Sequence, residues 1–85
     1  MTDELVEQIV VSAVQRAYDD WAVEHPSLAA VIDQVSLTAR AAESLRESPE
    51  YAQAVTEYHQ GRSHLTLLEQ FVGLAGQVLK TILAS

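Results

Sequence analysis

A single register of apolar residues runs through residues 48–83 and constrains the fold more than any other feature of the sequence. Steps of seven along this stretch lead from Tyr51 to Tyr58, Leu65, Val72 and Leu79. The position three residues after each step is also apolar or small: Ala54, Gly61, Leu68, Ala75 and Ile82. Such a heptad is typical of a helix that lies nearly parallel to a neighbouring helix. The sequence therefore predicts an all-α helical bundle.

The heptad predicts one long helix from Pro49 to Leu83, with Ser48 as its N-cap. An alternative is a four-helix bundle broken near Gly61, because glycine often follows the last turn of a helix and Ser63 could cap a new one. We favour the continuous helix because the heptad passes through Gly61 in phase. On this interpretation Gly61→Ala is expected to be neutral or stabilising.

Two further helices precede the long one. The spacing of apolar residues predicts an amphipathic helix over residues 3–23. Pro26 is expected to end this helix near His25. Its inward face contains Val6, Ile9, Val10, Ala13, Val14, Ala17, Tyr18 and Trp21. Residues 28–47 predict a second helix that buries Leu28, Val31 and Val35, among others. The short link at Ser48 and Pro49 predicts that helices two and three are antiparallel neighbours, so residues 1–85 form one small antiparallel bundle of three helices.

The C-terminal half of the long helix carries a second apolar stripe beside the heptad positions. Its members are Leu67, Phe71, Leu74 and Val78. A helix that is apolar around most of its girth needs more than one neighbour to cover it. We therefore predict that this stripe is an interface between two copies of the chain, with Phe71 as its anchor, and that Phe71→Asp converts a dimer into a folded monomer.

Charge and composition exclude several classes of partner. The net charge is −7, which argues against binding to nucleic acid or to anionic membranes and favours basic partners. The absence of cysteine excludes disulfides and thiolate sites. The apolar run from Leu65 to Ala84 is interrupted by Glu69, Gln70, Gln77 and Lys80, so we do not expect it to span a membrane. A cytoplasmic protein is expected.

No residue pattern predicts catalysis, a cofactor or a metal site. His59 and His64 are five residues apart and would point to different sides of a helix, whereas metal ligands must converge. Tyr18, Trp21 and His25 lie on one face and are expected to plug one end of the bundle. The Ser36-Leu37 pair also occurs in the serine motif of acyl carrier proteins, but that motif has Asp before the serine and lies at a helix start. Here Val35 precedes Ser36 and the pair falls inside a predicted helix, so no carrier role is expected.

The sequence thus predicts a non-catalytic interaction module that forms a homodimer through its C-terminal helix. The alternative is an acidic adaptor, chaperone or inhibitor that covers a basic or helical segment of another protein.

Overall fold

The computed structural model describes residues 4–84, and it consists of helices and short turns. The helices are α1 (Glu4–Glu24), α2 (Pro26–Ala29), α3 (Gln34–Glu47), α4 (Pro49–His59) and α5 (His64–Ala84). No strand occurs among the described residues, and the all-α prediction is confirmed. The molecule is elongated, with extents of 42 × 20 × 19 Å.

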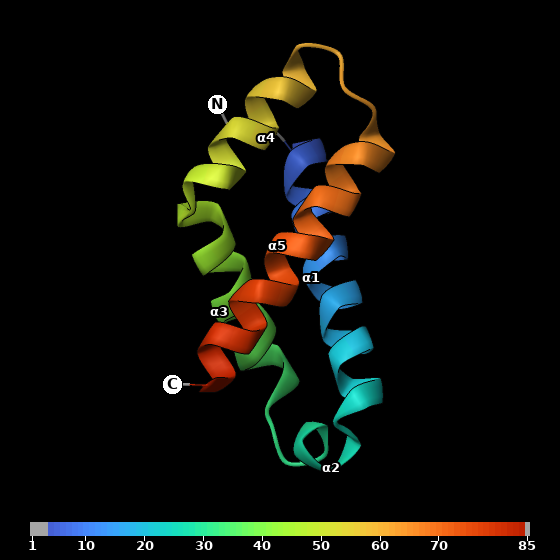
Figure 1. Ribbon diagram of the computed structural model, residues 1–85, viewed down its shortest axis with the longest axis vertical. Helices are drawn as coiled ribbons and strands as arrows, with labels where there is room; N and C mark the ends of the chain where they lie inside the picture. Colours follow the sequence, from blue (N-terminus) through green and yellow to red (C-terminus); the bar gives the residue numbers. More distant parts are fainter. Residues whose placement is uncertain (1–3, 85) are drawn as a thin grey trace.

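The chain passes three times along the long axis of the molecule (Figure 1). α1 runs in one direction, α3 and α4 return one after the other, and α5 again runs in the direction of α1. α1 and α5 share the most extensive contact, and α5 also packs against α3 and α4. The predicted reversal at Ser48 and Pro49 is therefore wrong. The chain bends there and reverses between α4 and α5 instead.

A single residue, Ser48, makes the bend between α3 and α4. Its backbone is extended (φ −76°, ψ 146°), as is preferred before proline. Its hydroxyl donates to the carbonyl of Leu45 at 2.8 Å and accepts from the N–H of Tyr51 at 3.2 Å. Ser48 therefore ends α3 and begins α4, but one extended residue redirects the chain without reversing it.

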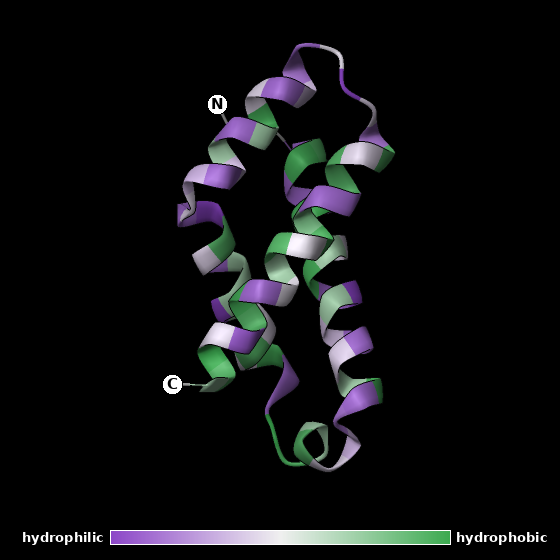
Figure 2. Ribbon diagram, viewed as in Figure 1, coloured by the Kyte–Doolittle hydropathy of each residue, from purple (hydrophilic) through white to green (hydrophobic). Residues whose placement is uncertain are grey.

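α1 agrees closely with the sequence. It was predicted over residues 3–23, and it covers Glu4–Glu24, with residue 3 outside the described part of the chain. Seven of the eight residues predicted to face inward are buried: Val6, Ile9, Val10, Ala13, Val14, Ala17 and Tyr18. The eighth, Trp21, is half-buried and packs against this core. Figure 2 shows hydrophobic and hydrophilic positions alternating along α1 and α5.

The continuous helix from Pro49 to Leu83 is wrong, because the chain breaks at Gly61. Gly61 has φ +113°, in the region that favours glycine. The N–H of Gly61 donates to the carbonyl of Tyr58 at 3.0 Å, and the N–H of Arg62 donates to the carbonyl of Glu57 at 3.3 Å. This is the hydrogen-bond pattern of a Schellman motif, which ends α4. Ser63 then caps α5 by accepting from the N–H of Thr66 at 3.1 Å.

The helix predicted over residues 28–47 is also interrupted. The four-residue α2 ends at Ala29, and α3 begins only after Asp33, whose carboxylate accepts from the N–H of Val35 at 3.1 Å. Leu28, Val31 and Val35 were predicted to be buried, yet they are 53%, 80% and 76% exposed. The reason is that Asp33 acts as an N-cap and turns the chain, so α3 buries a different face from the predicted stripe. Its buried residues are Leu37, Ala41, Ala42 and Leu45, of which Ala42 and Leu45 belong to the predicted stripe, whereas Ala39 of that stripe is exposed.

The buried face of α5 differs from the heptad. Its fully buried residues are Leu67, Phe71, Ala75 and Leu79, which recur every four residues. Leu65, a heptad position, is 60% exposed. The heptad therefore matches α4 and α5 only in part, and its passage through Gly61 is not evidence of a continuous helix.

α5 is also long and apolar enough to cross a membrane, judged by length and composition alone. The core helix of a soluble protein passes the same test. In the described structure α5 packs against α1, α3 and α4, and its buried face forms part of their common core.

Alanine substitution of two glycines tests the turn at Gly61. Gly61→Ala is expected to lower the free energy of unfolding by about 1–2 kcal/mol, since an L-residue is strained at positive φ. Gly76→Ala is the matched control: Gly76 lies inside α5 with no heavy atom within 4 Å of an added Cβ, so a gain of about 0.5–1 kcal/mol is expected. Denaturant unfolding measures both. A gain at Gly61 as large as the gain at Gly76 would contradict the turn.

Candidate functional site

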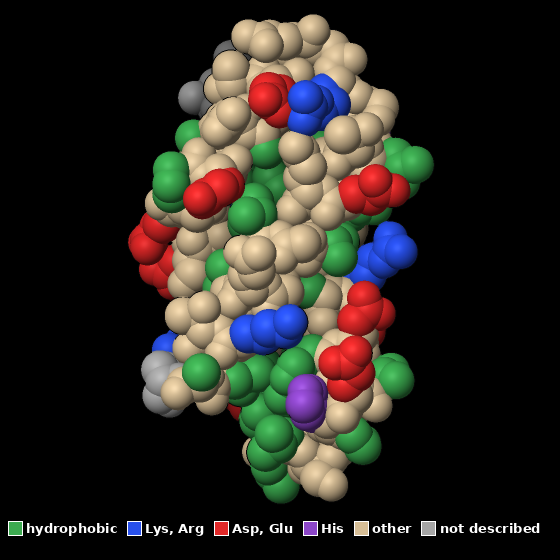
Figure 3. Space-filling view, viewed as in Figure 1, with side chains coloured by type: hydrophobic (Ala, Val, Ile, Leu, Met, Phe, Trp, Pro, Cys, Tyr) green, Lys and Arg blue, Asp and Glu red, His purple; other side chains and the backbone are tan. Residues whose placement is uncertain are grey.

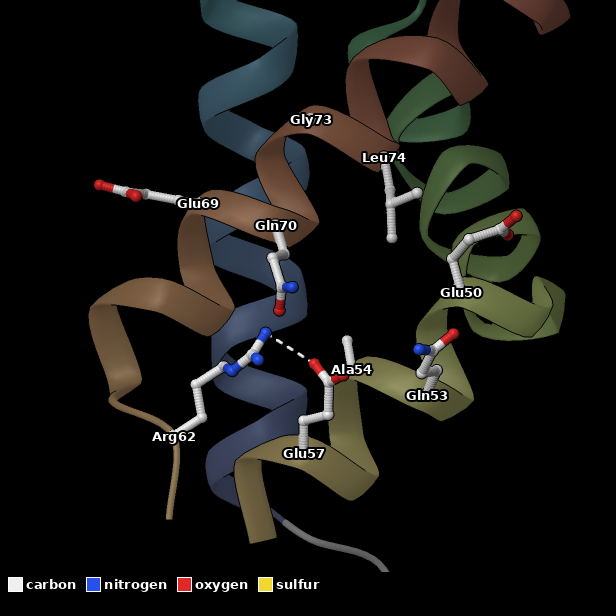
Figure 4. Close-up of a pocket in the computed structure, with 9 residues that line it drawn as sticks. All are labelled: Glu50, Gln53, Ala54, Glu57, Arg62, Glu69, Gln70, Gly73 and Leu74. Carbon is white, nitrogen blue, oxygen red and sulfur yellow. Dashed lines mark ion pairs between the residues drawn. The ribbon is translucent and has the colours of Figure 1, made fainter. Parts of the chain in front are cut away.

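A furrow runs along one side of α5. Its upper section lies between α4 and α5 and has a volume of about 480 Å³. The residues that line it are Glu50, Gln53, Ala54, Glu57, Arg62, Glu69, Gln70, Gly73 and Leu74 (Figure 4). These residues come from α4, from the turn after it and from the first half of α5, so the reversal at Gly61 is what brings them together.

The lower section lies between the C-terminal half of α5 and the α3–α4 bend, with a volume of about 240 Å³. It is lined by Ser44, Ser48, Glu50, Leu74, Gln77, Val78, Thr81 and Ile82. Glu50 and Leu74 line both sections, so we treat the two as one furrow, from Arg62 to Ile82. Figure 3 shows hydrophobic side chains in the hollow and acidic side chains on both sides of its upper part.

The floor of the furrow is apolar and is built from small or half-buried side chains. Ala54 is buried at 4% exposure, and Leu74 and Val78 are half-buried and pack against the core. Gly73 has no side chain, and an added Cβ would meet no heavy atom within 4 Å. Small residues on facing positions of α4 and α5 therefore leave space that larger side chains would fill.

The upper section carries three carboxylates and one guanidinium. Arg62 and Glu57 point toward one another in Figure 4 and form an ion pair at 2.6 Å. Glu50 stands on the α4 side, and Glu69 extends outward from α5. Within residues 4–84 no ion pair involves Glu50 or Glu69, so the surroundings of the furrow have an excess of negative charge.

Gln70 contributes an unsatisfied polar atom to the furrow. Its side chain points into the space between α4 and α5 (Figure 4), and its Oε1 is buried without a hydrogen-bond partner in the described structure. A buried acceptor without a donor costs roughly 1–3 kcal/mol. A donor that entered the furrow would recover part of this energy.

The predicted interface stripe is divided between the core and the furrow. Leu67 and Phe71 are both 0% exposed within the single chain. The ring of Phe71 stacks on Tyr51 of α4, with centroids 5.3 Å apart. Leu74 and Val78 lie in the furrow instead. Phe71 therefore holds α5 against α4 and is not available as an exposed anchor.

The aromatic cluster at the end of α1 forms as expected from the sequence. The ring centroids of Tyr18 and Trp21 are 5.9 Å apart, and those of Trp21 and His25 are 5.3 Å apart. Tyr18 is buried, Trp21 is half-buried and His25 is exposed. The side chains of this cluster therefore become more exposed from Tyr18 toward His25, at the end of α1.

Among residues 4–84, no group of three or more His, Asp or Glu side chains is placed to hold a metal ion. His59 ends α4 and His64 begins α5, so the turn at Gly61 separates them. Outside the furrow, Arg46 of α3 forms an ion pair with Glu7 of α1 at 2.7 Å, and Asp33 and Ser36 converge at the start of α3.

Ser36 lies in the first turn of α3, not inside a longer helix as predicted. Its hydroxyl donates to the second carboxylate oxygen of Asp33 at 2.9 Å. This bond and the backbone N–H groups of Ser36 and Val35 lower the pKa of the Asp33 carboxyl below its usual value. Both side chains are thus used in capping α3, and Val35 still occupies the position before the serine.

An apolar surface around α2 was not predicted from the sequence. Val23, Leu28, Val31 and Val35 are all more than half exposed there. Figure 2 shows hydrophobic residues around this end of the molecule. The signal that could have revealed it is Asp33, a favoured N-cap residue that lies between Val31 and Val35.

Comparisons of the chain with protein-family models, with characterised proteins and with solved structures find no match. The chemistry of the furrow therefore carries the functional argument.

The cap at Asp33 predicts a pH-dependent contribution to stability. Because its pKa is lower in the folded chain, the charged cap stabilises the fold above the ordinary aspartate pKa of 3.8, and this stabilisation is lost as the pH falls through the lowered value. Asp33→Ala should therefore lower the melting temperature most at neutral pH and less near pH 3. Asp33→Asn is the control, since it keeps the acceptor but not the charge, and its stability should not vary through titration of this position. An Asp33→Ala deficit that is the same at both pH values would contradict the charged cap.

Proposed function

We propose that the protein is a non-catalytic interaction module that holds a helical segment of another polypeptide in the furrow beside α5. The observation that carries this proposal is the open apolar floor at Ala54, Gly73, Leu74 and Val78. A groove between two helices, with an apolar floor and polar edges, is a common docking site for a third amphipathic helix. A cytoplasmic location and independence from cofactors, nucleic acid and membranes are part of the proposal.

The geometry favours the adaptor form of this function over self-association. Phe71, the anchor of the predicted homodimer, and Leu67 of the same stripe are already buried in the core of one chain. A two-fold dimer through the furrow would also bring the same acidic surface of both subunits into one interface, so the carboxylates of Glu50 and Glu57 would be present there twice. A partner of different charge avoids this repulsion.

Self-association through the lower section is the second candidate. Leu74 and Val78 remain half-buried there, and among residues 4–84 Glu50 is the one ionisable residue that lines this section. Sedimentation of the purified protein separates the two candidates. We expect a folded monomer at micromolar concentration. A dimer that Val78→Glu dissociates into folded monomers would favour self-association instead.

Leu74→Glu tests the docking function directly. The probe is a synthetic helical peptide with one leucine-rich face and glutamine elsewhere, added to isotopically labelled protein. We expect amide shifts confined to the furrow and binding about tenfold weaker in Leu74→Glu, because a carboxylate replaces half-buried apolar surface that the peptide covers.

Leu65→Glu is the matched control, since Leu65 also lies on α5 but is already 60% exposed and does not line the furrow. Its affinity for the peptide should equal that of the wild type. Shifts centred on the apolar surface around α2, or an equal effect of the two substitutions, would contradict docking in the furrow.

A further inference from the structure

We propose that the furrow selects a basic amphipathic helix: a segment whose apolar face lies on Leu74 and Val78 and whose flanks carry lysine or arginine. This inference rests on the proposed function and adds the chemistry of the occupant. It commits to a segment of another protein and not to a second copy of this chain.

The first argument is the charge on the two sides of the furrow. Glu50 and Glu57 lie on the α4 side and Glu69 on the α5 side, against Arg62 alone. Cationic flanks on an occupant would therefore meet carboxylates on either side, which improves both affinity and the rate of encounter. The net charge of −7 extends this preference beyond the furrow. A second copy of the chain, with the same net charge, is disfavoured on the same grounds.

The second argument is the buried amide oxygen of Gln70. It has no hydrogen-bond partner in the described structure, and its side chain points into the upper section (Figure 4). An acceptor of this kind needs a donor, and lysine and arginine offer several N–H groups and no acceptor. A cationic side chain that entered beside Glu57 would balance that carboxylate, and rotation of the Gln70 side chain would bring its buried oxygen to the same donor.

The third argument is that Arg62 already occupies such a position. Its guanidinium lies 2.6 Å from the carboxylate of Glu57, with both side chains about one-third exposed. The Schellman motif uses only the backbone N–H of Arg62, so its side chain can leave Glu57 without breaking the end of α4. The pair shows that the upper section accommodates a guanidinium, and Arg62 must compete with any cation that an occupant brings.

The length of the furrow is sufficient for such a helix. From Arg62 to Ile82 the chain advances twenty residues, or roughly 30 Å at 1.5 Å per residue. An occupant of four to five turns would place apolar residues at steps of three and four along the floor. Its remaining positions would then lie beside Glu50, Glu57 and Glu69.

The test compares three synthetic helical peptides that share one leucine-rich face and differ only in their flanks, which are lysine, glutamine or glutamate. We expect the lysine peptide to bind about tenfold more tightly than the glutamine peptide, and the glutamate peptide to bind most weakly. The difference should shrink when the salt concentration is raised from 50 to 500 mM. Equal binding of the lysine and glutamine peptides would overturn this inference and leave the proposed function standing, whereas no binding of any peptide would overturn both.

Substitutions of single charged residues then test whether the preference for the lysine peptide arises in the furrow. Glu57→Gln and Glu50→Gln should each weaken binding of the lysine peptide by about two- to fivefold. Arg62→Gln should strengthen it by a similar factor, because it removes the competing cation. Glu24→Gln, at the far end of α1, removes the same charge outside the furrow and should change binding little. A weaker complex with Arg62→Gln, or an equal effect of Glu24→Gln and Glu57→Gln, would overturn the inference.

Discussion

Burial of one face of α5 is the constraint on which the rest of the structure depends. Leu67, Phe71, Ala75 and Leu79 are at most 1% exposed, and α1, α3 and α4 together provide their cover. That cover is possible only because the chain reverses at Gly61 and brings α5 back along its predecessors. The stacking of Phe71 on Tyr51 then holds α4 against α5. The furrow is the part of this contact that small side chains leave unfilled.

The parts of the fold that could be predicted are those in which apolar residues recur at a constant spacing over a long segment. α1 is the clearest case, since its apolar positions recur at helical spacing over twenty residues and nothing in it competes with the helix. The breaks between helices were harder to predict because each depends on a single residue. At Gly61 a Schellman motif ends α4 although the heptad continues in phase. At Asp33 one carboxylate caps α3 and interrupts the apolar stripe predicted for residues 28–47.

The candidate site could be predicted only in part. Hydropathy identified Leu67, Phe71, Leu74 and Val78 as a stripe that needed cover, but hydropathy is similar for residues that face the core and for those that face a groove. Their division depends on where α4 packs against α5, and that follows from the turn at Gly61 and the small residues Ala54 and Gly73. The acidic sides of the furrow could not be predicted either, because Glu57 and Glu69 come to line the same hollow only after the reversal.

The most direct test of this account is a distance across the furrow. The chain has no cysteine, so Glu50→Cys and Gln77→Cys can be spin-labelled without background, and both positions are exposed and line the lower section. Pulsed electron paramagnetic resonance should give a distance of less than about 25 Å, since helices that pack against each other lie roughly 8–10 Å apart before the length of the labels is added. A single helix through Gly61 would separate the two positions by about 40 Å, at 1.5 Å for each residue. A distance distribution centred near this larger value would contradict the reversal at Gly61, and therefore also the furrow.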